Sequence, residues 1–197
     1  MTTRREILQL AACATLPSVL GASSPATASA ATRHADLHAV LVEASHISAR
    51  AFGAQLATRG TNVISLQGGD ITAAWLAHIQ PAWRARPATI AGLTTASALF
   101  CFEQLAWSQG LRVVFHAEHI VHADNVVEHA LQRVDQGTNV GSAALLRAGA
   151  GWPLRLADAM ATRRVVTGSR QGPSWAALEP TLPDGAQLLT SWVIAAA

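Results

Sequence analysis

Four short apolar runs between Asp36 and Ile120 decide the fold of this chain. They read His38-Ala-Val-Leu-Val42, Asn62-Val-Ile-Ser-Leu66, Ala88-Thr-Ile-Ala-Gly-Leu93 and Leu111-Arg-Val-Val-Phe115. Each run is rich in β-branched residues, which predicts a strand. The segments between them have helical periodicity, and strands that alternate with helices pair in parallel because each connection crosses over the sheet. The sequence therefore predicts an α/β domain with a three-layer, Rossmann-like or flavodoxin-like, mostly parallel sheet.

The three intervening helices have recognisable start and stop signals. Ser45, Asp70 and Thr95 are suitable N-cap residues, because a short polar side chain can accept a hydrogen bond from the first helical turn. We expect the first helix to reach Thr58. The second should end near Pro81, whose ring lacks an N–H group.

The chain after Ile120 is less regular. Residues 121–136 fit either a helix capped by Asn125, which we slightly prefer, or the return strand of a hairpin that turns at Asp124-Asn125. Short helices are predicted at residues 141–148 and 154–162, followed by a long loop over 163–182. The apolar tail at 187–195 predicts a last strand, placed as an antiparallel edge of the sheet.

The N-terminus resembles a twin-arginine (Tat) export signal. Thr3-Arg-Arg-Glu-Ile-Leu-Gln9 follows the order of that motif, with Ile7 and Gln9 where Phe and Lys are common. An apolar stretch comes next, and Ala28-Ser-Ala30 fits a signal-peptidase site. The resemblance implies a signal peptide over 1–30, cleaved near Ala30, and export of the folded protein by the Tat translocase to a bacterial periplasm. The rest of the chain resembles small Tat-exported proteins of unassigned function.

The expected organisation is thus a signal peptide and one α/β domain over 31–197. That domain has a core over 36–120, a less regular part over 121–186 and the last strand. Leu10-Ala-Ala-Cys13 also matches a lipoprotein box, although few apolar residues precede it. If the leader is removed, Cys101 is the one remaining cysteine, and its apolar neighbours predict a buried, unreactive thiol.

Composition excludes some classes of function. Half of the residues are hydrophobic and 13% are charged, which favours a folded core. We expect no integral membrane span in the mature chain. All 14 basic residues are arginine, and they are scattered along the chain, so no nucleic-acid surface is predicted. The absence of lysine excludes Schiff-base chemistry, and no phosphate-binding loop, dinucleotide fingerprint or hydrolase elbow occurs. No cofactor is assigned.

The fold predicts where a site would lie. In open α/β sheets, ligands bind outside the carboxyl ends of the strands. Gly68 and Gly69 would let a ligand approach the backbone closely there, and Thr95 opens a helix whose N–H groups suit a cofactor's anionic group. Thr94 lies at the same edge. His116 or His119 could act as acid or base with Glu43 or Asp70, which makes His116, His119, Asp70 and Thr94 the catalytic candidates.

A second candidate is the cluster His116-Ala-Glu-His119-Ile-Val-His122. Imidazole and carboxylate groups are suitable ligands for zinc, copper or nickel, so His116, Glu118, His119 and His122 are the metal-binding candidates. On a strand, however, His119 would point to the opposite face from the other three.

These observations leave three hypotheses open. The first is an exported ligand-binding protein, or an accessory protein that travels with a partner subunit of an exported enzyme. The second is a small enzyme that uses His116 or His119 at the strand ends. The third is a protein that binds metal through the histidine cluster.

Overall fold

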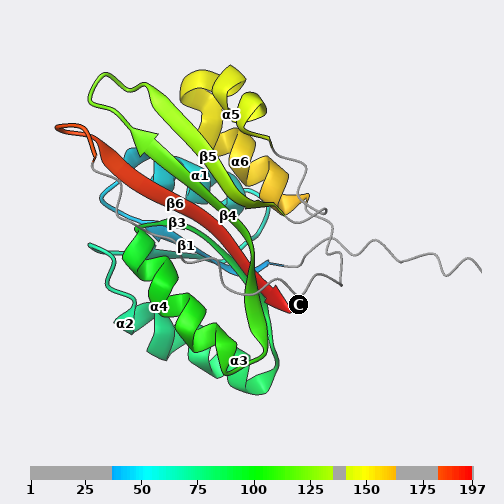
Figure 1. Ribbon diagram of the computed structural model, residues 1–197. Coiled ribbons are helices and arrows are strands. Elements are labelled where there is room, and N and C mark those ends of the chain that lie inside the picture. The colour runs from blue at the N-terminus through cyan, green and yellow to red at the C-terminus, as the bar shows by residue number, and fades with distance from the viewer. Residues whose placement is uncertain (1–36, 135–140, 163–181, 197) are drawn as a thin grey trace, which may run out of the picture. The chain divides into compact units, whose positions relative to one another are not determined.

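A six-stranded mixed sheet forms the centre of the molecule (Figure 1). The computed structural model describes residues 37–134, 141–162 and 182–196; the leader and most of the loop over 163–182 lie outside them. The strands are β1 (Leu37–Glu43), β2 (Val63–Leu66), β3 (Thr89–Thr94), β4 (Leu111–Val121), β5 (Val127–Val134) and β6 (Gln187–Ala196). Their order across the sheet is β2-β1-β3-β6-β4-β5. The predicted α/β class is confirmed.

The sheet is mixed rather than mostly parallel as predicted: it is parallel at one end and antiparallel at the other, because β4 pairs antiparallel with both of its neighbours. β1 pairs in parallel with β2 and β3, whereas β6 pairs antiparallel with β3 and β4, and β5 pairs antiparallel with β4. The predicted strand over 187–195 is therefore antiparallel, but its placement at the edge is wrong. Leu189 and Val193 join one core and Trp192 and Ile194 the other, and a strand that is buried on both faces belongs inside a sheet.

Helices cover both faces of the sheet (Figure 1). One hydrophobic core contains side chains of α1 (Ile47–Ala57), α5 (Ser142–Ala148) and α6 (Trp152–Ala161), and a short 3-10 turn, η2 (Gly149–Gly151), joins the last two. The other core contains side chains of α2 (Thr72–Ala74), the π turn η1 (Trp75–Ile79), α3 (Gln80–Ala85) and α4 (Ala96–Trp107). No helix in the described part of the chain is both long and apolar enough to span a membrane.

The preferred helix over 121–136 is wrong, and the hairpin interpretation is correct. β4 and β5 pair from Phe115 to Val121, and the turn between them is closed by a hydrogen bond from the Asn125 N–H to the His122 carbonyl, 2.9 Å long. Asn125 has a φ of 65°, a left-handed conformation that asparagine tolerates better than most residues. Local turn geometry thus outweighs the helical spacing of the valines.

Pro81 does not end the second helix as predicted. The helix continues to Ala85 and buries Trp83, whose Nε1 donates to the Ala88 carbonyl at 2.9 Å. The π turn η1 ends at Ile79, two residues before Pro81, and Pro81 lies in the first turn of α3, where the missing N–H of proline is tolerated.

A bulge in β4 decides which way its histidines point. The pairing of β4 with β6 shifts register between Val113 and Phe115, so these two residues face different cores although alternation would place them on one side. From Phe115 onward, alternate residues face the α1–α6 side. His119 is one of them and is fully buried, whereas His116 and Glu118 face the opposite side and are partly exposed.

Candidate functional site

The carboxyl ends of β1 and β2 are joined by a buried carboxylate. Glu43 accepts hydrogen bonds from the N–H groups of Gly68 (2.9 Å) and Gly69 (2.8 Å), and from Ser45 Oγ (3.0 Å). Both glycines have positive φ, and a Cβ on Gly69 would lie 2.8 Å from Thr95 Oγ1. The N–H groups predicted to meet a ligand therefore bind the protein's own carboxylate. Ligand binding at Gly68 and Gly69 stays a prediction, and it would require displacement of Glu43.

The other strand-end candidates also have partners within the fold. Thr94 is buried, and its Oγ1 accepts from Trp192 Nε1 at 2.9 Å. Thr95 caps α4 as predicted, accepting from the Ala98 N–H at 3.3 Å. Asp70 is exposed and accepts from the Thr72 N–H at 2.8 Å, a hydrogen bond that lowers the pKa of its carboxyl. Each side chain has a structural role at the end of its strand or the start of its helix.

The fold separates the histidines and acids of the predicted metal cluster. His122 pairs with Glu128 in the hairpin at 2.8 Å, and Glu118 accepts from Gln132 at 3.3 Å. His119 lies on the other face of β4, as the alternation predicted. Among the described residues, no group of three or more His, Cys, Asp or Glu side chains is arranged to hold a metal ion.

His119 instead belongs to a buried hydrogen-bonded chain. Its Nε2 lies 2.7 Å from Ser191 Oγ on β6, and its Nδ1 lies 2.7 Å from Nδ1 of His129 on β5. The indole of Trp152 packs on both imidazoles, with ring centroids 4.5 Å from His119 and 5.1 Å from His129. We call Ser191, His119 and His129 the histidine relay.

Electrostatics keep this relay neutral. Burial, together with the neighbouring imidazoles of His129 and His116, lowers the pKa of His119 to about 3. Burial also lowers the pKa of His129. With one proton between the two Nδ1 atoms, one imidazole donates and the other accepts, so the tautomers of His119 and His129 are coupled.

Ser191 and His119 do not form a nucleophile–base pair that a substrate could reach. Ser191 lies inside β6 with no exposed surface, so a substrate carbonyl cannot approach its Oγ. His129 is the member that reaches the surface, because it lines a cavity of about 230 Å³ between the hairpin and α5. Sequence reasoning missed the relay, since Ser191 is 72 residues from His119 and carries no motif.

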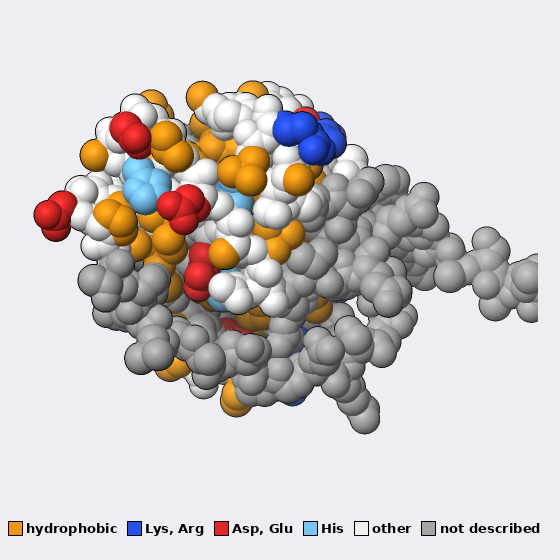
Figure 2. All heavy atoms as spheres, turned by 45° about the horizontal axis from the view of Figure 1, so that its top comes forward, with side chains coloured by type: hydrophobic (Ala, Val, Ile, Leu, Met, Phe, Trp, Pro, Cys, Tyr) orange, Lys and Arg blue, Asp and Glu red, His pale blue; other side chains and the backbone are white. Residues whose placement is uncertain are grey.

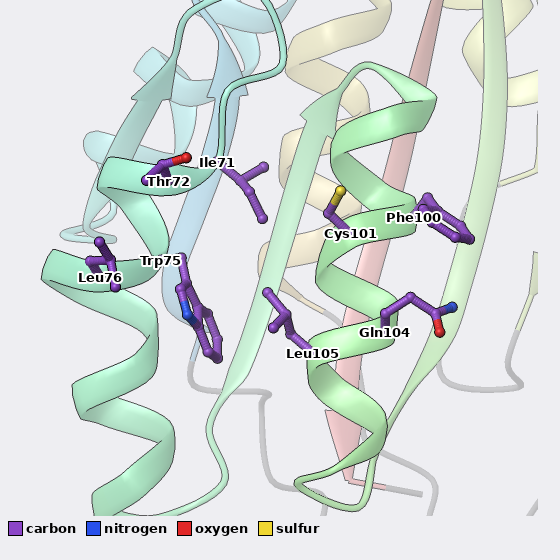
Figure 3. A pocket seen from close by; sticks show the side chains of 8 residues that line it. All are labelled: Ile71, Thr72, Trp75, Leu76, Phe100, Cys101, Gln104 and Leu105. Carbon is purple, nitrogen blue, oxygen red and sulfur yellow. The ribbon is translucent and has the colours of Figure 1, made fainter.

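A larger concave surface lies between α2–η1 and α4. This apolar groove has a volume of about 460 Å³, and Figure 3 shows Ile71, Trp75 and Leu105 pointing into the gap between the helices. The other lining residues are Thr72, Leu76, Phe100, Cys101 and Gln104. Cys101 is exposed here, which contradicts the predicted buried thiol. α4 buries Ala98, Leu99 and Phe102, and Cys101 lies on the opposite side of the helix.

Comparisons of the chain with protein-family models, with curated proteins and with solved structures gave no match.

Proposed function

We propose that this chain is an exported ligand-binding protein and that the apolar groove between α2–η1 and α4 is its binding site. The observation that carries the proposal is the exposure of large hydrophobic side chains along the groove: Leu76 is 58% exposed and Phe100 50%. A contiguous apolar surface in contact with water is unfavourable, and in soluble proteins it marks a binding site. The volume of about 460 Å³ falls within the range of roughly 300–1,000 Å³ typical of small-molecule pockets.

The lining of the groove indicates the class of ligand. No charged side chain is among its lining residues, and the polar groups are those of Thr72 and Gln104, the Cys101 thiol and the indole N–H of Trp75. A charged ligand would lose its hydration without gaining an ion pair. We therefore propose an uncharged, mostly apolar molecule with at most one or two hydrogen-bonding groups.

The proposal also includes location and fold type. The Tat-like motif supports a periplasmic location, with the Tat translocase as the partner in export. The order β2-β1-β3 with helical crossovers is how a flavodoxin-like sheet begins, which supports a Rossmann-like or flavodoxin-like three-layer origin for this end of the sheet. A partner subunit of an exported enzyme could occupy the same groove, and the experiment below distinguishes it from a small ligand.

The two alternatives from the sequence have less support. An enzyme with His119 as its base would need a free imidazole nitrogen, whereas both nitrogens of His119 lie within hydrogen-bond distance of Ser191 and His129. A metal site would need His116, Glu118 and His119 to converge, but they lie on two faces of β4.

Calorimetric titration with uncharged straight-chain alcohols, from hexanol to dodecanol, tests the groove. We expect saturable binding that strengthens about fourfold with each added CH₂ group, because each buried CH₂ contributes about 0.8 kcal/mol. An environment-sensitive dye on Cys101, in a Cys13→Ser background, should respond over the same concentration range.

The matched variants are Leu76→Glu and Ala77→Glu. Both residues are exposed on the same turn of helix, but only Leu76 lines the groove. Leu76→Glu should weaken dodecanol binding by about tenfold or more, since a carboxylate would enter an apolar site. Ala77→Glu should leave it unchanged. Equal affinities in the two variants, or binding that does not depend on chain length, would contradict the small-ligand proposal and leave the partner subunit as the occupant.

A further inference from the structure

We propose that the cavity beside His129 is a second binding site, for a small uncharged molecule that has an apolar body and one hydroxyl group. The cavity lies between the β4–β5 hairpin and α5, on a different face of the sheet from the apolar groove. Its lining residues are Asn125, Val126, Val127, His129, Leu145, Leu146, Gly149 and Ala150. The top of Figure 1 comes forward in Figure 2, where histidine side chains reach the surface among hydrophobic and acidic ones.

Two side chains that can form hydrogen bonds line this site, Asn125 and His129, and His129 is the one held in place by the relay. Its Nδ1 is held 2.7 Å from Nδ1 of His119, so Nε2, on the far side of the ring, points away from the relay. Within the described part of the chain, His129 has hydrogen-bonding contact with His119 alone and ring contacts with His119 and Trp152. Because His129 lines the cavity, the proposal assigns its Nε2 as the group that meets a ligand.

The buried part of the relay fixes the orientation of that nitrogen. Trp152 packs on the rings of both histidines, and Ser191 holds the far end of His119. A polar group whose neighbours hold it in place binds with less loss of conformational entropy than a mobile surface side chain. Because the tautomers are coupled, Nε2 of His129 can act as a donor or as an acceptor, and a hydroxyl group is a complementary partner for either.

Size and charge define the ligand further. A cavity of about 230 Å³ is smaller than the roughly 300–1,000 Å³ of drug-sized pockets, so it suits a molecule about as large as phenol. No charged side chain is among the lining residues, and burial lowers the pKa of His129, which keeps its ring neutral near neutral pH. The site therefore offers no counter-ion to a carboxylate.

Three probes of similar size test the site by NMR: phenol, toluene and benzoate. We expect saturable shifts of the His129 imidazole and the Val127 methyl groups with phenol at millimolar concentrations. Toluene, which lacks the hydroxyl group, should bind about tenfold more weakly, since the hydrogen bond to Nε2 would be lost. Benzoate should bind more weakly than phenol. Tighter binding of benzoate, or no saturable shift at His129 with phenol, would overturn the proposal.

Two variants test separately what the hydrogen bond and the cavity contribute to binding. His129→Phe should abolish the preference for phenol over toluene. Ala150→Leu should weaken both ligands, because it fills the cavity and leaves the relay intact. Ala143→Leu, an exposed substitution on α5 outside the lining, is the control and should bind as the wild type does. Unchanged phenol binding in Ala150→Leu would also overturn the proposal, and this readout does not depend on whether His129→Phe folds.

Discussion

His119 shows how one buried side chain links the stability of this fold to pH. It is fully buried, it is held by Ser191 and His129, and its pKa of about 3 lies far below the ordinary value of 6.5. In the unfolded chain the imidazole takes up a proton at a higher pH than in the folded chain. The folded state therefore loses stability as the pH falls from about 6.5 towards 3.

We predict that His119 alone lowers the free energy of unfolding by about 2 kcal/mol between about pH 7 and pH 5, at 1.36 kcal/mol per pH unit below 6.5. His129, whose pKa is also lowered, acts in the same direction. Urea unfolding followed by tryptophan fluorescence at the two pH values measures the loss. His119→Gln should flatten the pH dependence, while the exposed substitution His78→Gln should keep it. A wild-type stability that is constant over this range would contradict the prediction.

At the scale of secondary-structure elements, the pairing of β3 with β6 depends on a close contact between one pair of residues. Gly92 pairs with Trp192, whose indole lies over the glycine and donates to Thr94. A Cβ on Gly92 would lie 2.4 Å from Cζ2 and 2.5 Å from Cε2 of Trp192. Glycine is therefore required in β3 by the packing of β6, and no local property of β3 indicates this.

Gly92→Ala should destabilise the fold by about 1–3 kcal/mol, because the buried indole has to move within a packed core. Gly151→Ala is the matched control: its Cβ would meet nothing within 4 Å, and we expect a change of less than about 0.5 kcal/mol. Urea denaturation measures both. Combining Gly92→Ala with Trp192→Phe should cost less than the sum of the single changes, since the smaller ring relieves the contact. Additive effects would argue against a direct clash.

At the scale of the whole molecule, we expect export to depend on the N-terminal motif as well as on the folded domain. We propose from the Tat-like motif that the protein is exported in its folded state, in which β6 lies between β3 and β4.

Replacing Arg4 and Arg5 with lysine should leave uncleaved precursor in the cytoplasm, because recognition of this signal class depends on the arginine pair. Cell fractionation with an antibody against the domain measures precursor and product. Arg33→Lys, outside the motif, is the control and should be processed normally. Export of the double variant at the wild-type rate would contradict the Tat interpretation.

The sequence alone was sufficient for features that depend on short-range patterns. The alternation of β-branched runs with helical segments predicted β1, α1, β2, β3 and α4 in order. Thr95 was correctly identified as a cap, because capping involves residues only three positions apart. The caps predicted at Ser45 and Asp70 were wrong: the N-caps of α1 and α2 are His46 and Ile71, and neither makes a side-chain capping hydrogen bond. The apolar run at the C-terminus correctly predicted an antiparallel strand.

Tertiary structure decided the features that depend on distant residues. The position of β6 inside the sheet, the bulge that turns His119 towards Trp152, and the contact of Glu43 with Gly68 and Gly69 each depend on pairing between segments far apart in the chain. Cys101 was misplaced because apolar neighbours in sequence do not reveal which side of α4 faces the core. Sequence patterns therefore located the carboxyl ends of the strands, and a site was expected there. Only the packed fold showed that their polar groups are satisfied internally and that the apolar groove and the cavity beside His129 remain open.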